Sequence, residues 1–106
     1  MNHREFVMAM GEGYQAGLVR KCRAYADLMA ETIEEIADAV TDEDMADPDR
    51  AAELAADVLD MKESGVRALD AADGLERGEL SDDVCEDAER FAGLYDECRA
   101  ANSGDL

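Results

Sequence analysis

Apolar side chains recur at steps of three and four residues over the first forty positions of the chain. This spacing keeps them on one face of an α-helix, whereas a β-strand would need a step of two. The sequence therefore predicts a long N-terminal helix, within residues 2–40, with one apolar stripe. The residues of the stripe are Val7, Met10, Tyr14, Leu18, Cys22, Tyr25, Met29, Ile33, Ile36 and Val40.

Three glycines, Gly11, Gly13 and Gly17, interrupt this pattern near its start. A glycine inside a helix costs about 0.5–1 kcal/mol relative to alanine, so three of them suggest a structural reason. One interpretation is a short first helix over residues 3–10, capped by Asn2 and followed by a bend. The other is a continuous helix in which Gly13 and Gly17 let a second backbone approach closely. The bend is slightly favoured.

Two further helices follow. Residues 41–47 are expected to form a loop, and Asp47-Pro48 is a strong helix start, with an N-cap residue and proline at the first helical position. Gly74 is the expected end of this second helix. Ser81 is expected to cap the last helix. The apolar residues of these two helices are Ala51, Leu54, Val58, Met61, Gly65, Leu69 and Ala72, and then Val84, Ala88, Phe91, Tyr95 and Cys98.

Short connections between long helices favour antiparallel neighbours. The predicted fold class is therefore all-α, an antiparallel three-helix bundle with one long N-terminal helix, or four helices if the first one breaks near Gly11–Gly17. With 106 residues, the chain is expected to form a single domain.

Composition makes this bundle an unusual one. The chain has 28 acidic and 10 basic residues, a formal net charge of −18. Like charges at this density work against the compact state. The core that opposes them is thin, because 19 of the hydrophobic residues are alanine and only 19 are Leu, Ile, Val or Phe. We therefore expect marginal stability, increased by salt, by a partner or by self-association.

No pattern indicates catalysis or a cofactor. His3 is the only histidine and is expected to be solvated. The spacing of Cys22, Cys85 and Cys98 matches no zinc motif, and all three lie on apolar helix faces, so buried free thiols are expected. Asp42 and Asp44 could begin a calcium loop, but the required glycine is replaced by Asp47. The sequence thus predicts no enzyme, no cofactor and no bound metal.

The first residues form no signal peptide and no apolar run is long enough to span a membrane, so a cytoplasmic protein is expected. The sign of the charge argues against nucleic acid as a direct partner, because phosphate binding needs basic patches.

Acidic residues form rows on the polar faces of the helices, and the rows carry mostly one sign. A face that is merely solvated would gain from pairs of opposite charge at i,i+4, so something outside the fold is expected to favour the acids. Carboxylates about 6 Å apart along a helix resemble the phosphate spacing of a nucleic-acid strand. The densest group, called the tip patch below, is the predicted binding site and consists of Glu31, Glu34, Asp38, Asp42, Glu43, Asp44, Asp47 and Asp49.

In size and charge pattern, the chain resembles the small acidic DNA-mimic inhibitors of phages and mobile elements, including some anti-CRISPR proteins, although no alignable motif is shared. The resemblance implies a basic partner protein or complex that normally binds nucleic acid. The alternative is a helical adaptor or assembly subunit from a halophilic organism, whose acidity is a solvent adaptation; two Lys against eight Arg and fifteen Asp fit that habit. A homodimer that completes the thin core also stays open.

Overall fold

The computed structural model describes residues 1–103, with the side chains of residues 1–101. Every regular element in this range is a helix: α1 (His3–Met10), α2 (Glu12–Ala39), α3 (Asp42–Ala46), α4 (Pro48–Glu76) and α5 (Asp82–Ser103). The predicted all-α class is confirmed. The predicted loop over residues 41–47 is wrong in part, because Thr41 and Asp44 cap each other's backbone and start the one-turn helix α3.

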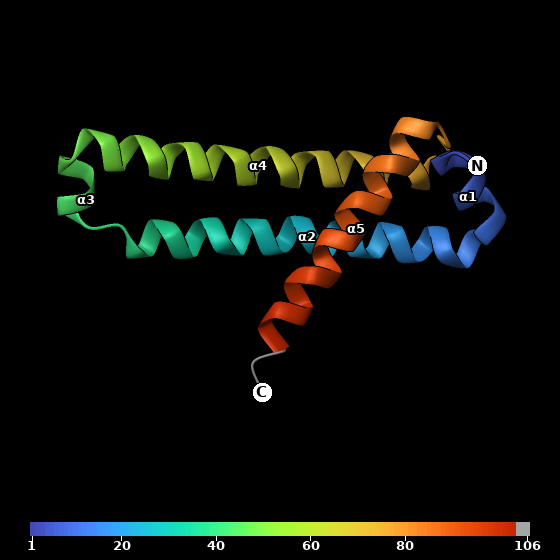
Figure 1. Cartoon of the computed structure of the whole chain (residues 1–106), viewed down its shortest axis with the longest axis horizontal. Helices are drawn as coiled ribbons and strands as arrows, with labels where there is room; N and C mark the ends of the chain where they lie inside the picture. The colour runs from blue at the N-terminus through green and yellow to red at the C-terminus, as the bar shows by residue number, and fades with distance from the viewer. Residues whose placement is uncertain (104–106) are drawn as a thin grey trace.

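The two long helices α2 and α4 run antiparallel, side by side, and α3 joins them at one end (Figure 1). The last helix, α5, does not run along this hairpin. It crosses α4 obliquely near its C-terminal end and α2 near its middle, and α1 packs against it (Figure 1). The molecule measures 53 × 33 × 21 Å, and α1 and α5 cover only one part of the elongated hairpin.

The first helix breaks at Gly11, which has a φ of +90°, a conformation that favours glycine. The break lets α1 fold back so that Val7 is fully buried. The bend interpretation is therefore confirmed. Gly13 and Gly17 lie inside α2, and a Cβ added to either would meet no atom within 4 Å, so neither glycine permits a close approach.

The predicted helix starts are confirmed. The side chain of Asn2 accepts a hydrogen bond from the N–H of Glu5, that of Asp47 from the N–H groups of Asp49 and Arg50, and that of Ser81 from the N–H of Val84.

The predicted end of α4 at Gly74 is wrong. The helix continues to Glu76 and ends in a Schellman motif, in which Gly78, with a φ of +80°, donates to Leu75 and Glu79 donates to Gly74. Gly74 instead serves packing, because a Cβ there would lie 3.1 Å from the Cγ1 of Val84 on α5.

The core lies entirely at the end that α5 covers. Phe91 is 2% exposed and packs on Tyr25, with 5.4 Å between the ring centroids, in a core cluster that includes the small side chains of Ala68 and Ala72. By contrast, no residue from Asp27 to Ser64 is buried. We call residues 27–63 the distal arm. It comprises two helical segments and the turn between them, and its apolar stripe is only partly covered.

Candidate functional site

The tip patch lies on the distal arm, around the end marked by α3 in Figure 1. Glu31, Glu34 and Asp38 lie on α2, on the side opposite Ile33 and Ile36, and are exposed. Asp42 and Glu43 belong to the first turn of α3, and Asp49 to the first turn of α4. The structure thus brings the eight predicted residues to one end of the molecule.

Two of the eight have structural roles. The Asp44 carboxylate accepts hydrogen bonds from the backbone and hydroxyl of Thr41 and lies 3.8 Å from Arg50; these contacts, the Thr41 bonds above all, lower the pKa of Asp44. Asp47 caps α4. Within residues 1–101, whose side chains are described, the other six carboxylates form no ion pair, so their charge is directed to solvent.

The charge of the distal arm exceeds that of the rest of the chain. The arm has fourteen acidic side chains and two basic ones, a formal net charge of −12, whereas the remaining residues carry −6. Several cations at the other end are neutralised across helix contacts. Lys21 lies 2.8 Å from Asp96, and Arg23 lies 2.7 Å from Glu76, a contact that lowers the pKa of the Glu76 carboxyl. The negative potential is therefore concentrated on the arm.

An apolar face of α4 begins on this arm and continues beyond it. The sequence indicated Leu59 as apolar surface that a homodimer could use, but it did not indicate Val66 and it placed Leu69 in the core. On α4, Leu59, Val66 and Leu69 are 60%, 50% and 42% exposed, and they are spaced seven and three residues apart, on one face of the helix. Hollows between α2 and α4 open beside them. The sequence signal for this face is the seven-residue spacing of Leu59 and Val66, neither of which is among the predicted core positions.

His3 is not simply solvated. Its Nδ1 lies 2.7 Å from the Oε2 of Glu89, and this hydrogen bond raises the pKa of the imidazole. Next to it, the backbone N–H of Arg4 donates to the Asp82 carboxylate at 3.2 Å. The pair ties α1 to α5, which is a structural role.

The three cysteines are free, as predicted; the predicted burial is confirmed for Cys22 and Cys85 and is wrong for Cys98, which is partly exposed. Burial raises the pKa of the Cys22 thiol to about 11, and its S–H donates to the carbonyl of Ala88 at 3.4 Å. A protonated, enclosed thiol is a poor nucleophile.

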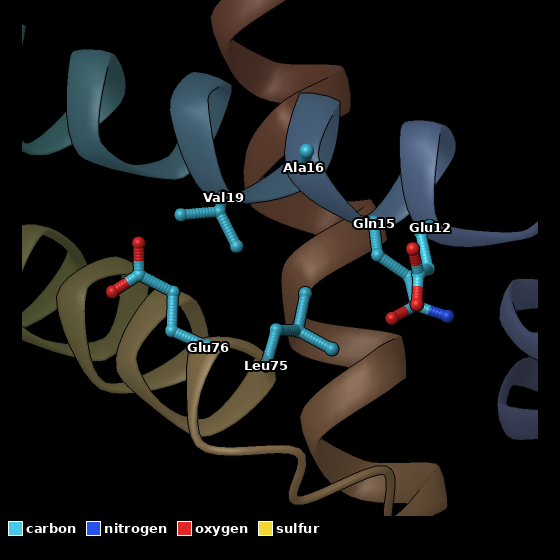
Figure 2. A pocket seen from close by; sticks show the side chains of 6 residues that line it. All are labelled: Glu12, Gln15, Ala16, Val19, Leu75 and Glu76. Carbon is cyan, nitrogen blue, oxygen red and sulfur yellow. The ribbon is translucent and has the colours of Figure 1, made fainter.

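A shallow hollow lies between the start of α2 and the end of α4, on the side away from α5 (Figure 2). Val19 and Leu75 point toward its floor, and the Glu12 and Glu76 carboxylates lie at its rim (Figure 2).

Separately, the side-chain ligand atoms of Asp82, Asp83 and Glu86 lie within 4.8 Å of one another. These acids are exposed in the first turn of α5, where the helix dipole favours them. Asp42 and Asp44, whose spacing was compared with a calcium loop, lie within helix α3.

None of the helices in residues 1–103 is both long and apolar enough to cross a bilayer. No family model matches the chain, and neither a curated protein nor a solved structure matches it.

Proposed function

We propose that this protein binds a basic, nucleic-acid-binding protein through the carboxylates of the distal arm and competes there with nucleic acid. The single observation that carries the proposal is the charge of the arm, −12 over 37 residues, with seven of the eight tip-patch carboxylates left without an ion pair in the part of the chain whose side chains are described.

The energetic argument is that these carboxylates oppose folding. Acids at i,i+4 rise about 6 Å along a helix, and two unit charges at that distance repel by about 0.7 kcal/mol in water before salt screening. Glu31, Glu34 and Asp38 form such a row on α2, although opposite charges there would stabilise the helix. A basic surface would relieve this repulsion on binding.

The geometry suits a groove that binds phosphates. The arm is a pair of antiparallel helices that extends beyond α5, so its charged sides are accessible from several directions (Figure 1). Its charge would attract a basic protein over long distances, giving fast and salt-sensitive association. The class of small acidic DNA-mimic inhibitors works by this kind of competition, and the proposal places the protein in that class. Its partners would then be proteins, not nucleic acid or membrane.

The test compares two variants of equal charge. The tip variant carries Glu31→Lys, Glu34→Lys and Asp38→Lys; the control variant carries the same reversal at three exposed acids outside the arm and away from α4, Asp83, Glu86 and Glu97. Each has a net charge of −12 in place of −18. Wild type and both variants are immobilised, and captured proteins are eluted with double-stranded DNA or RNA and identified.

We expect wild type and the control variant to capture the same nucleic-acid-binding protein, which nucleic acid displaces, and the tip variant to lose it while keeping its helical circular dichroism. Capture that nucleic acid cannot displace, or that the two variants lose equally, would contradict the proposal. The second outcome would favour the alternative of an adaptor or assembly subunit whose acidity is a solvent adaptation.

A further inference from the structure

Two apolar hollows lie between α2 and α4, along the distal arm and just beyond it, on the side of the hairpin away from α5. Figure 2 shows that side, with α5 behind α2 and α4 and with Val19 and Glu76 in view. On α2, Ala26 and Ile33 follow Val19 at steps of seven, and on α4, Leu69 and Lys62 precede Glu76 at the same steps, so they share that side.

Two hollows lie in line along this side. The first is lined by residues within 26–33 of α2 and 61–69 of α4, and has a volume of about 170 Å³. The second, nearer the tip, has a volume of about 250 Å³, is bordered by Met45, and shares Ile33 with the first. An apolar cavity of about 150 Å³ holds benzene, so each hollow has room for a large apolar side chain. We call them together the arm groove.

The arm groove is as long as a helix of about five turns. From Ala51 to Leu69, the residues of α4 that line it span eighteen steps, about 27 Å at 1.5 Å per residue. An amphipathic helix of about eighteen residues would run its full length and place side chains of its apolar face, at i, i+3, i+4 and i+7, into the hollows.

The rims of the groove carry negative charge. Asp27, Glu34 and Asp38 line the outer side of α2, and Glu63 and Asp70 that of α4, and all are exposed. Lys62 is the one basic side chain among the residues lining the two hollows. A second copy of this chain would bring another arm of −12 against the first, whereas a helix with basic residues on both sides of its apolar face would be attracted.

We propose that the arm groove binds a basic amphipathic helix of the partner protein, with its apolar face on Val66 and Leu69 and its cations on the carboxylate rims. This inference rests on the proposed function and adds to it. The acids provide attraction to any basic surface, and the groove selects a helical segment.

The test uses two peptides of eighteen residues with identical composition. In one, leucines at i, i+3, i+4 and i+7 form an apolar face and lysines fill the other positions; in the other, the same residues are scrambled. Their affinities are measured by fluorescence anisotropy for wild type, for the groove variant Val66→Gln/Leu69→Gln, and for a control variant Met8→Gln/Met10→Gln. The control residues are 48% and 52% exposed on α1, outside the groove, so both variants remove exposed apolar surface without changing the charge.

We expect the amphipathic peptide to bind wild type at least about tenfold more tightly than the scrambled one, and the groove variant to lose at least about tenfold of that affinity. The control variant should match wild type. Chemical-shift changes on binding should fall on Ala30, Ala37 and Ala55.

Equal affinities for the two peptides would overturn the proposal that the arm groove binds a helix, but would leave the proposed charge-based function standing. If neither peptide binds, both proposals are overturned. Binding that the groove and control variants weaken equally would overturn the groove as well. Sedimentation of wild type as a dimer that the groove variant converts to monomer would also overturn it, because a second copy would then be the occupant.

Discussion

A series of three truncations to alanine tests whether the core is confined to one end of the molecule. Phe91 is 2% exposed beneath the crossing of α5, Ile33 is partly buried on the distal arm, and Leu59 is 60% exposed on the same arm. If α5 alone completes the core, the cost of truncation should fall steeply along this series.

The magnitudes follow from burial. Removing a buried Phe costs about 3–5 kcal/mol, and removing a buried Ile about 2–5 kcal/mol. Because Ile33 keeps part of its surface in water, we expect about 1–2 kcal/mol for Ile33→Ala, and less than about 0.5 kcal/mol for Leu59→Ala. Proteins of this length have a free energy of unfolding of about 5–15 kcal/mol, and self-repulsion places this one at the low end. Phe91→Ala should therefore remove most of the stability.

The assay is equilibrium unfolding followed by circular dichroism, with urea at a fixed KCl concentration, because guanidinium is itself a salt and would screen the charges under test. With a slope of about 2 kcal/mol per molar urea, Phe91→Ala should lower the midpoint by about 2 M and Ile33→Ala by about 0.5–1 M. A loss for Ile33→Ala as large as for Phe91→Ala would refute the reasoning, since it would mean that the arm is covered in solution.

Three further results are expected. Raising KCl from about 0.05 to 1 M shortens the Debye length to about 3 Å, so the melting temperature of wild type should rise. The rise should be smaller for the variant Glu31→Lys/Glu34→Lys/Asp38→Lys. A chain that is helical only at molar salt would instead support solvent adaptation. The pKa of His3 is raised beside Glu89, so the stability that this pair contributes is full below the unfolded pKa of 6.5 and is lost as the pH rises through the folded pKa. His3→Ala should therefore lower the melting temperature at about pH 5.5 but not at about pH 9. An equal loss at both pH values would show that the ion pair contributes nothing. Gly17→Ala should stabilise the protein by about 0.5–1 kcal/mol in urea unfolding, whereas Gly78→Ala, at a φ of +80°, should destabilise it by about 1 kcal/mol, and the same sign for both would contradict the assigned backbone.

The sequence by itself determined where most helices begin, because those signals act within a few residues. Asn2, Asp47 and Ser81 each accept hydrogen bonds from N–H groups two or three positions on, so no distant contact is needed. The end of α4 was different. Gly74 and Gly78 both allow a helix to stop, and only the packing of Val84 against Gly74 assigns one to close contact and the other to the turn.

The sequence also established that the chain is acidic and that residues 31–49 are the densest part. It did not reveal that this stretch lies on an uncovered arm, because Met29 and Ile33 have the same helical spacing as Leu18 and Cys22, which are buried. Only the tertiary structure decided which part of the stripe is covered. The small residues Ala68, Ala71 and Ala72 let α5 approach the hairpin closely at one end, so Phe91 packs there and the groove of the arm stays open.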